Sequence, residues 1–244
     1  MAEEHSNIVD TCFAVLAVGG ESDEPRFLGT AFLIHADGGL LTCRHVAESV
    51  GEGERLAVLH FDNSGGSRES ALIVVDEILY PADEKLDLAY LPGAASVIES
   101  RVIWPTGDQS WILMGIEAHT FGYTARGNPF PVEIGYHSGS VVVRRHSDPN
   151  LGGYPSIALS FSVLEGMSGS PLLSADSPDL GRRIIGICCG NESHRIIARE
   201  VVSTEIDGRE VREQVQRLVE QGLALPLWTI FDFLREIGVE PASP

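Results

Sequence analysis

The sequence predicts an all-β protein, built as a barrel or sandwich of antiparallel strands. Nine short runs rich in β-branched and other apolar residues recur along the 244 residues. Turn-forming pairs such as Asp37-Gly38, Ser64-Gly65 and Gly152-Gly153 separate them, and helical periodicity is clear only after residue 208. Regularly spaced short strands with few long helical patterns are typical of barrels and sandwiches.

The nine predicted strands divide into two groups around a loop at 105–110. Five come before this loop, at 12–18, 27–35, 55–61, 71–80 and 86–91. Four come after it, at 118–123, 138–145, 156–163 and 183–189.

Two helices are expected near the end of the chain. Residues 209–221 place Val211, Val215, Leu218 and Val219 along one stripe, and Gly222 follows as a stop signal. Residues 227–237 form a second, more apolar stretch that ends at Gly238. We expect this last helix to pack against the body of the protein, because apolar stripes usually face a core. A helix that binds a partner is the alternative.

Charge and composition exclude several functions. Acidic residues outnumber basic ones 35 to 17, a net charge of −18, and this field opposes binding to nucleic acid or to an anionic membrane surface. The acidic start of the chain is unlike a secretory leader, and no apolar run is long enough for a membrane span. The four cysteines have no metal-ligand spacing, so we expect reduced, buried thiols, a cytoplasmic protein, no metal and no cofactor.

Three residues are candidates for joint chemistry. Ser168 lies in Gly-Met-Ser-Gly-Ser-Pro-Leu (166–172), where small neighbours allow a tight turn and close approach of a carbonyl group. The N–H groups of Gly166 and Ser168 could stabilise an oxyanion there. A plain Gly/Ser turn is the alternative.

His45 and Asp87 complete this set. His45 lies in the run Gly39–Ala47, where an apolar stretch gives way to a short helical pattern. This position would expose its ring, although a structural histidine is the common alternative. Asp87 alternates with apolar neighbours in a predicted strand, where burial without a donor is costly. An ion pair of Asp87 with Lys85 or an arginine is the other interpretation. A serine nucleophile needs a base, and the base needs an orienting carboxylate.

The chain order His45, Asp87, Ser168 is that of chymotrypsin-type enzymes. Residues 28–47, 86–91 and 165–172 resemble the three signature blocks of trypsin-like serine peptidases, and in particular the bacterial HtrA-like branch. Residues 222–226 resemble that family's final strand. The similarity extends over about residues 10–237.

The resemblance implies two antiparallel six-stranded β-barrels, 1–104 with His45 and Asp87 and 105–244 with Ser168, plus a C-terminal helix and an extra helix before the last strand. It implies a serine endopeptidase that cleaves a protein substrate through an acyl-enzyme. In this mechanism Ser168 attacks, His45 carries the proton, Asp87 orients the imidazole, and Gly166 and Ser168 form the oxyanion hole. The implied substrate pocket is lined by Ser162, Cys189, Gly190, Asn191 and Gly222.

This chain departs from the family in several places. Met167 stands where zymogen-activated trypsins have an aspartate, and Ser170 replaces a glycine. No carboxylate lies at the base of the implied pocket, so we expect cleavage after a small or medium uncharged residue. We also expect no PDZ domain after residue 238.

Residues 191–221 are longer than the corresponding family segment, with an extra strand at 195–202. This insertion is either a gate for a regulatory protein partner beside the pocket or a decoration of the surface. A catalytically silent binding module with a closed pocket is the alternative function. A serine esterase of the α/β-hydrolase type is less well supported, because Gly-x-Ser-x-Gly and interstrand helices are missing.

Overall fold

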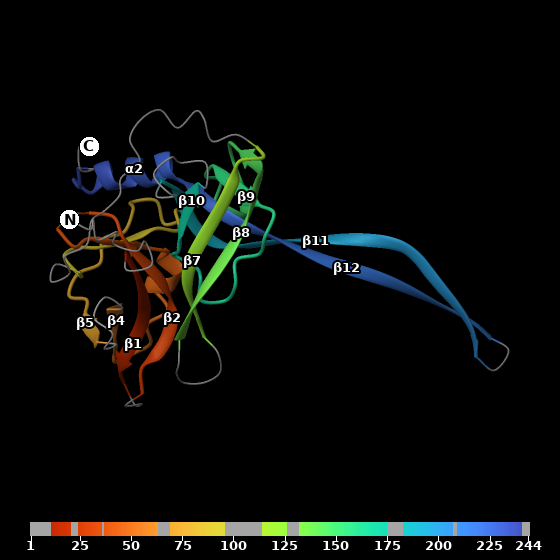
Figure 1. Ribbon diagram of the computed structural model, residues 1–244, viewed down its shortest axis with the longest axis horizontal. Helices are drawn as coiled ribbons and strands as arrows, with labels where there is room; N and C mark the ends of the chain where they lie inside the picture. Colours follow the sequence, from red (N-terminus) through yellow and green to blue (C-terminus); the bar gives the residue numbers. More distant parts are fainter. Residues whose placement is uncertain are drawn as a thin grey trace, which may run out of the picture.

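The computed structural model describes most of the chain as two six-stranded antiparallel sheets joined through a shared core. The described residues are 11–20, 24–35, 37–62, 69–95, 114–125, 132–174, 183–206 and 209–240. The predicted domain boundary at 104/105 and the loop at 105–110 lie outside them. Figure 1 shows the two sheets side by side, with one long hairpin projecting from the second.

The N-terminal sheet has the strand order β5-β4-β1-β2-β3-β6. Its strands are β1 (Cys12–Gly19), β2 (Arg26–Leu33), β3 (Leu40–Thr42), β4 (Glu54–Asp62), β5 (Glu69–Val74) and β6 (Ala89–Leu91). β1 lies in the middle and is almost completely buried, which explains its continuous apolar sequence. The strand β3 was not predicted from the sequence, because its three residues are too few to show a periodicity.

The C-terminal sheet closes into a barrel with the order β10-β11-β12-β9-β8-β7. Its strands are β7 (Glu117–Ala125), β8 (Val132–Arg145), β9 (Ser156–Leu159), β10 (Pro171–Ser174), β11 (Arg183–Ile206) and β12 (Arg209–Pro226). The expected all-β architecture of two six-stranded antiparallel sheets is therefore confirmed, with one closed barrel and one open sheet.

Two helices and a 3-10 turn between β8 and β9 accompany the strands in the described part of the chain. The helices are α1 (Arg44–Ala47) and α2 (Leu227–Glu236), and the 3-10 turn is η3 (Pro149–Leu151). α2 confirms the terminal helix predicted at 227–237, and it buries Leu227, Ile230, Phe233 and Leu234 against the core. Glu236 Oε1 accepts a 2.7 Å hydrogen bond from the N–H of Ala82, which ties α2 to the N-terminal half.

The helix predicted at 209–221 is wrong, because these residues form the outer part of β12. Thr204 pairs with Val211 and Ile206 with Arg209, so β11 and β12 make one long hairpin. A spacing of four residues is compatible with one side of a strand as well as with one side of a helix. Pairing with β11 and the strand preference of valine decide between the two. The extra strand predicted at 195–202 is confirmed as part of β11.

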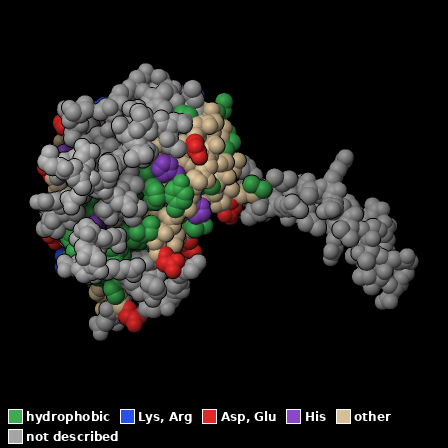
Figure 2. Space-filling view, in the orientation of Figure 1, with side chains coloured by type: hydrophobic (Ala, Val, Ile, Leu, Met, Phe, Trp, Pro, Cys, Tyr) green, Lys and Arg blue, Asp and Glu red, His purple; other side chains and the backbone are tan. Residues whose placement is uncertain are grey.

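The face over β7 and β8 gathers hydrophobic and histidine side chains (Figure 2). The rings of Phe121 and Tyr136 lie 5.0 Å apart, and His119 stacks edge-on to Phe121 at 5.5 Å. Acidic side chains are visible around this face and basic ones are scarce, in keeping with the charge of −18. None of the helices within the described ranges combines the length and apolar character needed to cross a bilayer.

Candidate active site

His45 and Asp87 are joined by two hydrogen bonds. The backbone N–H of His45 donates to Asp87 Oδ1 at 2.9 Å, and His45 Nδ1 lies 2.8 Å from Asp87 Oδ2. Because an ionised carboxylate can only accept, the Nδ1 atom of the neutral ring carries the proton and Nε2 keeps a free lone pair. Among the described residues, Asp87 pairs with His45 and forms no ion pair with Lys85 or an arginine.

Local structure explains how His45 is presented. In the short helix α1, Val46 and Ala47 turn into the core, which leaves the His45 side chain 49% exposed. The Asp87 side chain is only 22% exposed, between the buried Leu86 and Leu88. The imidazole therefore faces solvent on one side and a sheltered carboxylate on the other.

The loop before Asp87 is fixed to the C-terminal half. Tyr154 Oη donates a 2.7 Å hydrogen bond to Asp83 Oδ2, and Leu86 N–H bonds to Asp83 O at 3.1 Å. The hydrogen bond to Asp83 raises the pKa of Tyr154 to about 12, and the same bond lowers the pKa of Asp83. Both halves of the molecule thus determine where Asp87 lies.

Ser168 sits in a turn that two glycines make possible. Gly166 and Gly169 have φ angles of 90° and 88°, in the left-handed region. A Cβ at Gly166 would collide with the Phe27 ring, and one at Gly169 with Thr30 O. The turn docks on the N-terminal sheet because Thr30 N–H donates to Ser168 O at 2.9 Å.

The structure brings Ser168 into the same region as His45 and Asp87. A Cβ built on Gly29 would meet Val46, the neighbour of His45, at 2.8 Å and Ser168 O at 3.1 Å. Within the described residues, however, the Ser168 hydroxyl donates to Cys189 O at 3.4 Å, and the His45 ring bonds to Asp87. Two of the three predicted catalytic side chains are therefore bonded directly, and the hydroxyl of the third bonds to a backbone carbonyl group.

The two N–H groups predicted to bind an oxyanion make no hydrogen bond to the described part of the chain. Met167 N–H donates to Leu164 O at 3.0 Å and Gly169 N–H to Cys188 O at 2.8 Å. Among the hydrogen bonds of the described chain, Gly166 and Ser168 N–H have no acceptor. Both amides of the Ser168 turn are therefore available to a ligand.

The five predicted pocket residues lie on three neighbouring segments. Asn191 pairs with Gly222 across β11 and β12, and Gly222 N–H donates to Phe161 O at 2.7 Å. Ser162, predicted to form the floor of the pocket, donates a hydrogen bond from its Oγ to Glu220 O at 3.2 Å. Its hydroxyl is therefore already bonded to the backbone. Gly190 leaves open space where a Cβ would stand, and Cys189 is buried.

A side-chain bridge from Asn191 to Val163 was not predicted from the sequence. The side-chain amide of Asn191 reaches across Gly222 to Val163, where Oδ1 accepts from Val163 N–H and Nδ2 donates to Val163 O, both at 2.7 Å. A Cβ on Gly222 would stand 2.7 Å from Phe161 O and 3.0 Å from Val163 Cγ2. No sequence signal could reveal this bridge, because it depends on the register of β11 against β12.

The four cysteines are free thiols and buried, as expected from the sequence. Burial raises the pKa of Cys43 well above its usual value, and the neighbouring Cys189 raises it further. Burial also raises the pKa of Cys188 to about 12. Cys43 and Cys188 are therefore neutral thiols at physiological pH.

Comparison with known proteins agrees with this geometry. The trypsin-like peptidase domain matches residues 29–187, more than half of the chain. The chain belongs to this family. The chain is also similar to a probable periplasmic serine endoprotease, DegP-like, from Halomonas elongata, with 28% identity over 162 residues.

Solved structures with a similar fold include HtrA-type proteases. AlgW with a decapeptide matches 95% of this chain with a TM-score of 0.58 and 18% identity, and AlgW with a tripeptide matches 96% with a TM-score of 0.56 and 20% identity. The DegP-like match covers 66% of this chain and 30% of the relative, and the chain covers 65% and 62% of the two AlgW chains. This trypsin-like peptidase domain therefore spans only part of the proteins it resembles, and the expected resemblance to HtrA-like serine peptidases is confirmed.

Proposed function

We propose that this trypsin-like peptidase domain is a serine endopeptidase in which Ser168, His45 and Asp87 form the catalytic triad. The observation that carries the proposal is the double hydrogen bond between His45 and Asp87 beside the Ser168 turn. It fixes the ring orientation and tautomer that a general base requires. Membership of the family makes peptide-bond hydrolysis the reaction that best fits this arrangement.

The mechanism requires one rotation of a side chain. Ser168 Oγ leaves Cys189 O and turns to His45 Nε2, which takes its proton as Oγ attacks the carbonyl carbon of the substrate. Asp87 stabilises the imidazolium that results, and the open N–H groups of Gly166 and Ser168 hold the oxyanion. His45 then protonates the leaving amine. Water replaces the amine and attacks the acyl-enzyme while His45 takes its proton, and His45 returns this proton to Ser168 Oγ as the acid product leaves.

The preferred substrate residue is small and uncharged. The Asn191 amide spans the distance from β11 to Val163 and so fills part of the space between two of the proposed pocket walls. No carboxylate stands among Ser162, Cys189, Gly190, Asn191 and Gly222 to attract a cationic side chain. We expect cleavage after residues such as alanine, serine or valine.

A catalytically silent binding module is the second candidate. It is favoured by the hydrogen bond of the Ser168 hydroxyl to Cys189 O, which leaves the nucleophile turned away from its base. Incubation with a proteome-derived peptide library, followed by mass spectrometry of new termini, separates the two functions. The peptidase produces cleavage products that Ser168→Ala abolishes, whereas a silent module produces none with either protein.

The proposed substrate is a protein, in keeping with the peptides named in the AlgW structures. A regulatory protein partner would act through the hairpin of β11 and β12, because its base carries Asn191 and Gly222. The relative from Halomonas elongata is named periplasmic, whereas four free thiols favour a reducing compartment. We therefore propose a cytoplasmic location, and cell fractionation with an antibody against the chain tests it.

A further inference from the structure

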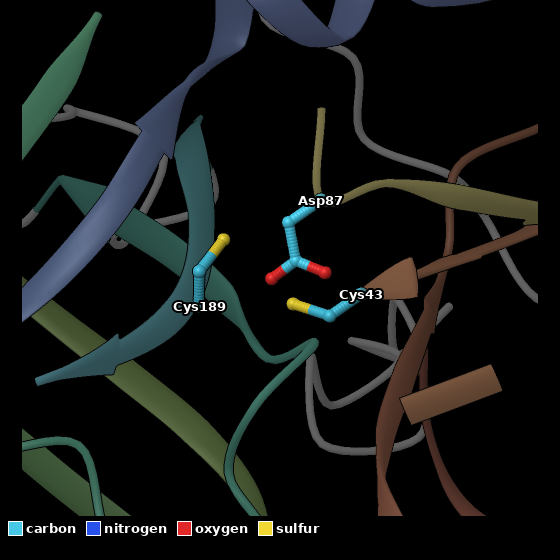
Figure 3. Close-up of side chains that lie close together, drawn as sticks. All are labelled: Cys43, Asp87 and Cys189. Carbon is cyan, nitrogen blue, oxygen red and sulfur yellow. The ribbon is translucent and has the colours of Figure 1, made fainter. Parts of the chain in front are cut away.

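Two cysteine thiols flank the carboxylate of Asp87. Figure 3 shows Cys43 and Cys189 directed toward it. One donor atom from each of the three residues lies within 4.8 Å of the others, and both cysteines are buried. Cys43 follows β3, Asp87 precedes β6 and Cys189 lies in β11, so the cluster joins the two sheets.

This set of donors suits zinc. Zinc binds cysteine sulfur at about 2.3 Å and carboxylate oxygen at about 2.0–2.2 Å, in a tetrahedron. Donors of such a tetrahedron are separated by about 3.5–3.8 Å, so a contraction of about 1 Å brings the three groups into position. Soft thiolates select zinc over magnesium or calcium, which prefer oxygen ligands alone.

The hydrogen bonds that the two thiols now make are weak, so breaking them requires little free energy. Cys43 Sγ donates to Cys188 O at 3.4 Å and Cys189 Sγ to Ile187 O at 3.5 Å. Cys188 O also accepts the N–H of Gly169 at 2.8 Å, so it stays paired when the thiol turns away. Zinc would replace the two thiol protons, which pass to solvent.

We infer that Cys43, Asp87 and Cys189 form a zinc site, with the fourth position open to water, through which zinc switches off the proposed peptidase. Asp87 is shared with His45, through both of its oxygens. A dication on this carboxylate withdraws the charge that would stabilise the imidazolium. The inhibitory half of this inference rests on the proposed function, and the metal-binding half does not.

Metal binding is tested with cobalt, which reports thiolate coordination by its colour. The reduced full-length chain is titrated with Co²⁺ under anaerobic conditions, and zinc is then added in competition. We expect one Co²⁺ per chain, with sulfur-to-cobalt charge-transfer absorption that zinc abolishes. The apparent affinity for zinc should fall more than about a hundredfold in Cys43→Ser and in Cys189→Ser.

The matched control is Cys188→Ser, which changes a buried thiol adjacent to the site but outside the cluster. It should bind cobalt as the parent does, and circular dichroism verifies the fold of each variant. The inference is overturned if the parent shows no charge-transfer band, if the band survives in Cys43→Ser, or if thiol counting finds Cys43 and Cys189 already linked as a disulfide.

Inhibition is measured by the rate at which a fluorophosphonate labels Ser168. Zinc should slow labelling of the parent at least about tenfold and leave Cys43→Ser unaffected. If zinc binds but labelling of the parent is unchanged, the regulatory half is wrong. If no variant is labelled even without zinc, the proposed peptidase fails, and the cobalt spectra still decide the metal site.

Discussion

At the residue scale, the two hydrogen bonds between His45 and Asp87 orient the imidazole that serves as the general base in the proposed mechanism. Replacing Asp87 by Asn puts an amide N–H opposite Nδ1, which favours the wrong tautomer of the ring. We expect the rate of Ser168 labelling by a fluorophosphonate to fall by about three to four orders of magnitude. Asp76→Asn is the matched control, since it changes an exposed carboxylate of the N-terminal half that pairs with Arg55. Equal labelling of Asp87→Asn and parent would contradict the role of Asp87.

At the residue scale we also expect the Asn191 side chain to limit the size of the substrate residue that the proposed pocket accepts. Asn191→Gly removes the amide that bridges to Val163, so larger side chains should enter. Against peptides that differ only in the residue before the scissile bond, the variant should gain at least about tenfold in kcat/KM for leucine or phenylalanine relative to alanine. Asn150→Gly, whose amide bonds to Glu192 instead, should keep the parental preference. A parent that already prefers phenylalanine would refute a shallow pocket.

The sequence predicted the proposed catalytic residues better than it predicted the residues that surround them in the site. His45, Asp87 and Ser168 were predicted from chain order and local pattern, and two of them are hydrogen-bonded in the structure. The Asn191 bridge and the cluster of Cys43, Asp87 and Cys189 are formed by residues far apart in the chain. Such contacts follow from strand register and from the packing of two sheets, which a single sequence does not encode locally.

At the element scale, an ionic network fixes the base of the hairpin to the end of β8. Arg145 contacts Asp148 at 2.7 Å and Glu192 at 2.6 Å, and Ser156 Oγ donates to Asp148 at 2.6 Å. Burial acts to raise the pKa of Asp148, but the hydrogen bonds from Ser156 and Arg145 outweigh it, so the pKa is lowered. The network thereby holds Glu192 beside the proposed pocket residue Asn191.

Because the pKa of Asp148 is lowered, we expect its contribution to the free energy of unfolding to depend on pH. The stabilisation is fully present above the unfolded pKa of about 3.9 and is lost as the pH falls through the lower folded value. Asp148→Asn should reduce the free energy of unfolding by about 1–3 kcal/mol near neutral pH. Urea unfolding should show this difference shrinking between about pH 4 and about pH 2. A difference that grows on acidification would exclude the assignment.

The hairpin also shows where pattern-based prediction fails. Residues 209–221 have a spacing that fits a helix, yet they form part of β12 because β11 offers a partner along most of their length, with one register shift between Ile197 and Val201. In contrast, the pattern at 227–237 correctly predicts α2, whose apolar stripe packs against the core. Local periodicity therefore decides only when no competing partner is available.

At the scale of the whole molecule, the hairpin extends far from the body (Figure 1). His194 pairs with Val219, and the inner pairs from Gly186 to Asn191 hold the barrel side of both strands. Replacing residues 195–218 by an Asn-Gly turn should therefore leave the fold and the labelling of Ser168 unchanged. Thermal unfolding and labelling rates check this outcome. Loss of folding would show that the outer hairpin is part of the structural core.

The central claim is that Ser168 is a nucleophile activated by His45 within a trypsin-like fold. The most direct measurement is reaction of the purified chain with a fluorophosphonate, followed by peptide mapping of the adduct. We predict one adduct per chain, on Ser168, lost in Ser168→Ala and slowed at least about a thousandfold in His45→Ala. No adduct on Ser168, or labelling that persists at the parental rate in His45→Ala, would contradict the account.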